Sequence, residues 1–69
     1  MKVRGGDRVV VSDRFPPTKR QINKLEVGDV GTVKSVYRHS LSEGIAIVDW
    51  DKGFRTTANE SDLDPEDKS

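Results

Sequence analysis

Short runs of β-branched and apolar residues, separated by polar segments marked with glycine, dominate the hydrophobic pattern of this chain. Residues 7–12 alternate so that Val9 and Val11 share one side, and residues 32–37 and 45–50 have a similar β-branched composition. Asp51-Lys52-Gly53 is typical of a tight hairpin turn, so residues 54–58 are expected to pair antiparallel with the preceding run. The pattern predicts an all-β fold of four or five short strands.

The predicted core takes one face from each strand. Val33 and Tyr37 share a side if the second strand is regular, and Val36 points to that side only if a β-bulge re-aims it. The residues expected to be buried are Val9, Val11, Val33, Val48 or Ile47, and Leu63.

The C-terminal part has weaker signals. Asn59 with Asp62 can cap a short 3₁₀ turn that returns Leu63 to the core. The end of the chain is polar, and it is expected to fray. We therefore expect one domain over residues 1–64 and a flexible acidic tail over residues 65–69.

A long connection separates the first two predicted strands. It opens at Pro16-Pro17, which cannot continue a ladder, and lasts to about Glu26. Thr18 and Gln21 have capping-box spacing, so one helical turn is expected inside it. Connections in compact domains usually run about 4–6 residues, which makes the segment Asp13 to Lys24 the main candidate for recognition.

Composition and charge narrow the function classes. The 69 residues allow a single domain with a small core, which favours surface recognition over a deep catalytic site. The chain has no cysteine, no apolar run of membrane-spanning length and no signal-peptide pattern, so a cytoplasmic location is expected. The formal net charge is zero, but residues 1–24 carry a net +5 and residues 43–69 a net −5. Mutual neutralisation of these two parts is the favoured interpretation.

Candidate catalytic and metal-binding residues are few. Asp49 and Asp51 are two apart, but they lack a third oxygen ligand nearby in sequence. His39 lies in a polar segment beside Ser40 and near Ser42, without the signature of a nucleophilic triad. We therefore predict no enzyme activity in the monomer, no metal and no cofactor.

The candidate binding residues combine one aromatic side chain with long cations, as interface hot spots do. They are Arg14, Phe15, Lys19, Arg20 and Lys24, all in the long connection. For Phe15 a second role is favoured, which is to fasten this connection onto the sheet. Trp50 is expected to close one end of the core rather than to stack on a base.

Four segments carry a resemblance to a known class of fold. Residues 6–11, 28–36, 48–53 and 60–63, with Gly-Asp motifs before two of the strands, look like the SH3-like barrels. These include KOW-type modules and the small accessory subunit of photosystem I. The resemblance implies a small five-stranded antiparallel barrel with a long first loop and a 3₁₀ turn near the C-terminus. The chain departs from KOW modules in the insertion between Val11 and Gly28, and it lacks the acidic aromatic signature of signalling SH3 domains.

Three functions follow from these observations, and the oligomeric state is left open. The leading hypothesis is a non-catalytic interaction module, an accessory or regulatory protein that docks on a larger protein assembly. The second is a KOW-like nucleic-acid binder, which the basic N-terminal third favours and the zero net charge opposes. The third is an oligomeric pore enzyme of the plasmid-type dihydrofolate reductase kind, which the chain resembles only at residues 6–9. Neither a membrane nor a small-molecule substrate is predicted as a partner.

Overall fold

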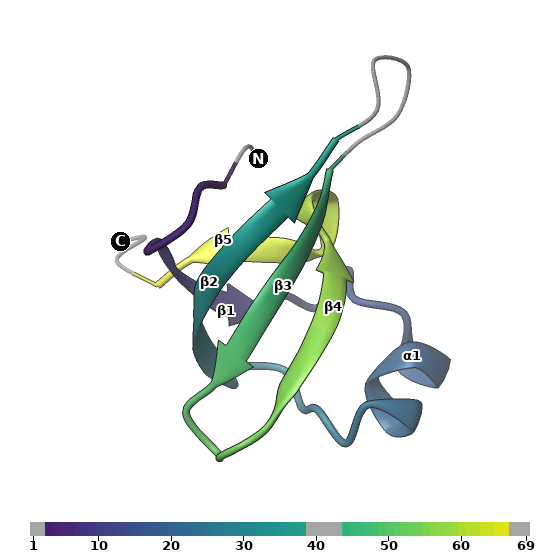
Figure 1. Ribbon diagram of the computed structural model, residues 1–69. Helices are drawn as coiled ribbons and strands as arrows, with labels where there is room; N and C mark the ends of the chain where they lie inside the picture. Colours follow the sequence, from purple (N-terminus) through teal and green to yellow (C-terminus); the bar gives the residue numbers. More distant parts are fainter. Residues whose placement is uncertain (1–2, 39–43, 67–69) are drawn as a thin grey trace.

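The computed structural model describes residues 3–38 and 44–66, which form one antiparallel sheet of five strands with a short helix at its side (Figure 1). The elements in chain order are β1 (Arg8–Val11), α1 (Pro17–Ile22), β2 (Val30–Tyr37), β3 (Ile45–Trp50), β4 (Arg55–Asn59), the 3₁₀ turn η1 (Glu60–Asp62) and β5 (Leu63–Pro65). The predicted all-β, five-stranded antiparallel class is confirmed. The strand order is β4-β3-β2-β1-β5, and the sheet is not closed by hydrogen bonds between β4 and β5 in the described part of the chain.

The predicted core is confirmed. Val9, Val11, Val33, Val48 and Leu63 are all 0–1% exposed, and Val48 rather than Ile47 takes the buried place on β3. The core also contains Phe15 and Trp50, as their expected fastening and closing roles require, together with Val3, Leu25, Ala46 and Ala58. Trp50 also donates a hydrogen bond from Nε1 to Thr56 Oγ1 at 2.7 Å, which satisfies the only polar atom of its ring.

A β-bulge in β2 decides which of its later residues are buried. Val33 pairs with Val48, but Ser35 pairs with Ile47, so one residue of β2 has no partner on β3. After the bulge Val36 is paired with the buried Ala46 and packs against the core, while Tyr37 is 63% exposed. The regular strand that would place Tyr37 beside Val33 is therefore not formed, because the extra residue reverses the alternation.

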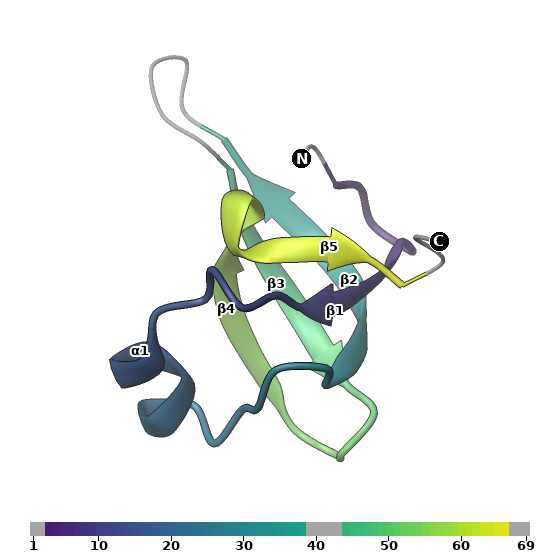
Figure 2. The same ribbon diagram turned by 180° about the vertical axis from the view of Figure 1, so that it is seen from behind.

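The end of the chain differs from its prediction. Leu63–Pro65 forms β5, which pairs antiparallel with β1 and lies beside it in the view from behind (Figure 2). Glu66 N donates to Arg8 O at 3.1 Å, so Pro65 and Glu66, expected in the flexible tail, belong to the folded domain. Residues 67–69 lie outside the described part. The 3₁₀ turn is where it was expected, but neither Asn59 nor any other side chain caps it.

One buried carboxylate joins three segments that are far apart in the sequence. The side chain of Glu60 is 6% exposed and accepts hydrogen bonds from Val3 N and Gly44 N, both at 2.8 Å. Arg38 donates to the same carboxylate from Nε at 3.2 Å and from Nη2 at 2.5 Å. These bonds lower the pKa of Glu60 to about 2, with the Arg38 bond as the largest cause. The carboxylate therefore holds residue 3, the start of β3 and η1 together.

Candidate functional site

The insertion between β1 and β2 is fastened to the sheet by two buried side chains. Phe15 is 1% exposed and Leu25 is 4% exposed, and both belong to the core. Arg20 Nε donates to Phe15 O at 3.0 Å, which ties the helix back to the chain two residues before its start. Phe15 thus takes the fastening role, and its ring is not on the surface as a binding side chain would be.

The short helix α1 begins at proline and ends in a left-handed residue. Pro17 is its first residue, a position where the missing N–H costs nothing, so the predicted capping role of Thr18 is wrong. Lys24 has φ of 57°, and the bonds Lys24 N to Gln21 O and Leu25 N to Arg20 O form a Schellman motif. This end turns the chain so that Leu25 enters the core. The same arrangement leaves Ile22 74% exposed.

Of the five predicted binding residues, the structure brings Lys19, Arg20 and Lys24 together on and just after α1. Arg14 is elsewhere, because its guanidinium binds Asp64 at 2.7 Å and the carbonyl oxygen of Ser61 at 3.1 Å. The hydrogen bond to Asp64 raises the pKa of Arg14 above its ordinary value. Arg14 therefore fastens the chain after β1 to the segment around η1 and β5.

Opposite charges from the two ends of the chain neutralise each other, as the favoured interpretation of the charge pattern expected. Arg8 binds Asp51 at 2.6 Å and Glu66 at 2.9 Å, and Arg14 binds Asp64. Three cations lie on α1 or just after it: Lys19, Arg20 and Lys24. None of them forms an ion pair with a carboxylate of residues 3–38 and 44–66. Three cations of the described part that form no ion pair with a described carboxylate thus lie on the insertion.

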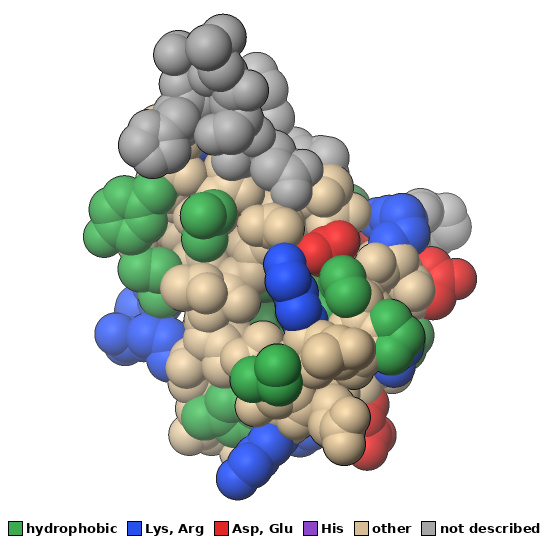
Figure 3. Space-filling model, turned by 90° about the vertical axis from the view of Figure 1, so that its right-hand side faces the viewer, with side chains coloured by type: hydrophobic (Ala, Val, Ile, Leu, Met, Phe, Trp, Pro, Cys, Tyr) green, Lys and Arg blue, Asp and Glu red, His purple; other side chains and the backbone are tan. Residues whose placement is uncertain are grey.

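A hollow of about 300 Å³ lies between the insertion and the end of β4. Phe15 and Ala58 give it apolar walls, and Lys19 and Asn23 line it from the helix. Its remaining lining residues are Ile45, Thr57, Asn59 and Asp62. On the face that carries α1, hydrophobic side chains lie among lysines and arginines, while the acidic side chains gather on the right-hand side (Figure 3). The hollow therefore has both apolar and polar walls, and its lining contains one cation, Lys19, and one acidic residue, Asp62.

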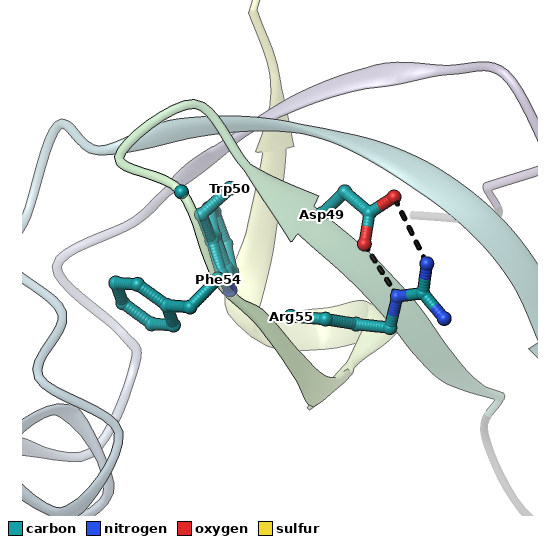
Figure 4. Close-up of a pocket in the computed structure, with 5 residues that line it drawn as sticks. Asp49, Trp50, Phe54 and Arg55 are labelled. Carbon is teal, nitrogen blue, oxygen red and sulfur yellow. Dashed lines mark hydrogen bonds and ion pairs between the residues drawn. The ribbon is translucent and has the colours of Figure 1, made fainter.

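A second, more open hollow of about 500 Å³ lies at the hairpin that joins β3 and β4. The rings of Trp50 and Phe54 lie on one side and the ion pair of Asp49 with Arg55 on the other (Figure 4). Gly53, with φ of 115°, completes the lining and the predicted tight turn. The hollow thus lies at the start of β4, at the opposite end of the strand from the first one.

The two aspartates weighed as a metal pair are held apart by different cations. Asp49 accepts from Arg55 Nε at 2.5 Å and lies 3.7 Å from Lys34 Nζ, and Asp51 binds Arg8. These bonds lower the pKa values of both carboxyl groups. In the part of the chain that the structure describes, no three His, Cys, Asp or Glu side chains are grouped to hold a metal ion. His39, Ser40 and Ser42 lie outside the described residues.

Comparisons of this chain with protein families, with curated proteins and with solved structures gave no match. Among the described residues, no helix has the length and apolar character needed to cross a membrane. The functional argument therefore depends on the surface itself. The sequence pattern identified the cations of the insertion, but it missed Ile22, Ile45 and the end of β4, whose exposure depends on how the insertion packs.

Proposed function

We propose that this protein is a non-catalytic interaction module that docks on a protein partner through the insertion between β1 and β2. The observation that carries the proposal is the contrast between the two sides of this insertion. Its inner side is fastened by the buried Phe15 and Leu25, and its outer side presents Lys19 and Lys24, which form no ion pair with a described carboxylate, beside an exposed Ile22. Because the inner side is fastened in this way, the backbone of the outer residues loses little conformational freedom on binding.

The composition of this surface favours a protein partner over a nucleic acid. Ile22 is 74% exposed on the helix, and the pair Tyr37 and Ile45 adds two further exposed apolar side chains. Interfaces between proteins combine such apolar groups with a few long cations. A phosphate-driven site would need more free cations, whereas Arg8 and Arg14 of the basic N-terminal third are already bound to carboxylates.

The SH3-like resemblance is part of the same proposal. The order β4-β3-β2-β1-β5, the long first connection and the 3₁₀ turn directly before β5 all fit the barrel that the resemblance implies. Such small scaffolds place recognition on their connections, because the core is too small to contain a deep site. A cytoplasmic accessory protein remains the setting we propose.

The test compares two charge reversals of equal size. Lys19→Glu changes the insertion, and Arg4→Glu changes an exposed cation that lies outside the insertion and forms no ion pair with a described carboxylate. Each tagged variant and the parent protein are used to capture partners from native lysate, and the captured proteins are quantified by mass spectrometry. We expect proteins that are retained by the parent and by Arg4→Glu and lost with Lys19→Glu. Capture that does not depend on Lys19 would refute this role of the insertion.

Two further measurements test the other hypotheses. Binding to DNA and RNA is measured over a series of salt concentrations, since a phosphate-driven site loses affinity steeply as salt rises. The mass in solution is measured by light scattering. Salt-dependent binding in the nanomolar range would establish the nucleic-acid hypothesis instead, and a tetramer would direct attention to the pore-enzyme hypothesis.

A further inference from the structure

The outer edge of β4 has unpaired backbone groups. β4 is the last strand of the sheet, and Trp50 N donates to Phe54 O at 2.8 Å. Backbone groups alternate in direction along a strand, so Thr56 and Ala58 turn theirs toward β3, and Arg55 and Thr57 turn theirs away from the sheet. Residues 3–38 and 44–66 form no hydrogen bond with these outward N–H and C=O groups of Arg55 and Thr57.

The other edge of the sheet is protected more fully than β4, whose Arg55 is charged and whose end at Thr57–Asn59 faces the insertion across a hollow. β5 is three residues long and ends in Pro65, which has no N–H to donate. Arg14 also occupies the carbonyl oxygen of Ser61 just before that strand. β4 has five residues and contains no proline and no lysine, and its pairing with β3 shows no bulge. Natural sheets usually block an edge with one of these devices, so the open edge of β4 is a position where another strand can pair.

Open space flanks this edge at both ends. The hollow beside the hairpin is lined by Gly53, Phe54 and Arg55, and the hollow beside α1 is lined by Thr57, Ala58 and Asn59. A strand that pairs with β4 lies about 4.8 Å from it and points alternate side chains in opposite directions. Side chains on one side of such a strand would enter the hollow beside α1, and those on the other side would face the solvent and the insertion.

We propose that the edge of β4 binds an extended peptide segment of the partner, which adds a sixth strand to the sheet and carries acidic side chains at alternate positions. The inference rests on the proposed function and specifies the conformation and charge of the partner. The acidic residues match Lys19, which borders the hollow and forms no ion pair with a described carboxylate. Small apolar residues between them match the apolar part of the lining, of which Ile45 is 43% exposed. Backbone hydrogen bonds supply affinity in this mode of recognition, and the alternate side chains supply specificity.

The test uses a blocked peptide of alternating glutamate and valine, Glu-Val-Glu-Val-Glu, and two variants at one position. Thr57→Pro removes the outward N–H at a place where an edge strand tolerates proline, and Thr57→Val keeps that N–H and a β-branched side chain. Titrations are followed by ¹⁵N NMR, together with hydrogen exchange of each backbone amide. We expect saturable binding below millimolar concentration and slowed exchange at Arg55 and Thr57. Thr57→Pro should weaken binding about tenfold and Thr57→Val less than about twofold.

Several results would overturn this inference. They are equal binding to Thr57→Pro and Thr57→Val, binding that leaves the amides of Arg55 and Thr57 in fast exchange, and no saturation at millimolar peptide. Protection of those amides by dimerisation without peptide would assign the edge to a second copy of this chain instead. If Thr57→Pro does not fold, the same peptide N-methylated at its central glutamate is compared with one N-methylated at its second valine, because the N–H groups of adjacent residues point in opposite directions. Methylation of the residue whose N–H faces β4 should weaken binding about tenfold, and equal affinities would count against strand pairing.

The two proposals can fail separately. If Lys19→Glu loses the captured partner and Thr57→Pro retains it, the insertion is the docking surface and the strand edge is not used. If capture does not depend on Lys19, the proposed function fails, and the exchange of the Thr57 amide in the presence of the peptide still decides whether the edge pairs.

Discussion

Replacing Glu60 with glutamine tests the most buried carboxylate among the ion pairs of the described residues. The substitution keeps the size of the side chain, but it exchanges one acceptor oxygen for an NH₂ group that faces donors from Val3, Gly44 or Arg38. A buried donor left without a partner costs about 1–3 kcal/mol, and a lost charge-assisted hydrogen bond costs about 1.5–3 kcal/mol. We therefore expect Glu60→Gln to lower the free energy of unfolding by about 3 kcal/mol. A domain of this size has roughly 3–5 kcal/mol in total.

Urea denaturation followed by Trp50 fluorescence measures this change, and circular dichroism without urea reports it if the variant is already unfolded. The matched control is Glu66→Gln, because Glu66 is also bound to an arginine but its side chain is 39% exposed. An exposed ion pair contributes about 0–1 kcal/mol, so the control should stay within about 1 kcal/mol of the parent protein. A Glu60→Gln variant as stable as the control would refute the role assigned to the buried carboxylate.

The same carboxylate predicts how stability depends on pH. The pKa of Glu60 is lowered from an ordinary value of 4.5 to about 2 in the folded protein. Because the folded pKa lies below the unfolded one, the stabilisation from ionised Glu60 is complete above about pH 4.5 and is lost as the pH falls toward about 2. Unfolding measured across this range should show a shallower pH dependence in Glu60→Gln than in the parent protein. Identical slopes would contradict the assignment.

Three further substitutions test the geometry of the fold, each by urea denaturation. Lys24→Gly should raise the free energy of unfolding by about 1 kcal/mol, because Lys24 has a left-handed conformation that glycine adopts without a Cβ clash. A loss of stability would contradict this. Gly31→Ala should lower it by about 1–3 kcal/mol, since the new Cβ would lie 2.7 Å from Asp49 O; an unchanged midpoint would argue against so close a packing. Trp50→Phe should lower it by about 1–2 kcal/mol through loss of the bond to Thr56, and parent-like stability would show that this bond contributes nothing.

The strands could be predicted because their signals are local. Residues 45–50 form β3 with the predicted limits, and the turn at residues 51–53 appears with glycine in the expected left-handed position. Alternation with a period of two identified Val9 and Val11 as buried without knowledge of any partner strand. The candidate site was only partly predictable: the cations are visible in the sequence, but the sequence does not show that Arg14 is bound to Asp64 while Lys19 and Lys24 form no ion pair with a described carboxylate.

The all-β class, the places of four strands and the concentration of positive charge in a long insertion follow from local patterns in the sequence. The bulge that exposes Tyr37, the pairing of residues 63–65 with β1 and the burial of Val3 depend on the tertiary structure. Propensity and periodicity act over a few neighbouring residues, so they do not specify contacts between residues that are far apart in the sequence. The contacts of Val3 with Glu60 and of Arg8 with Glu66 join positions 57 and 58 residues apart, and they exist only after the strands have paired.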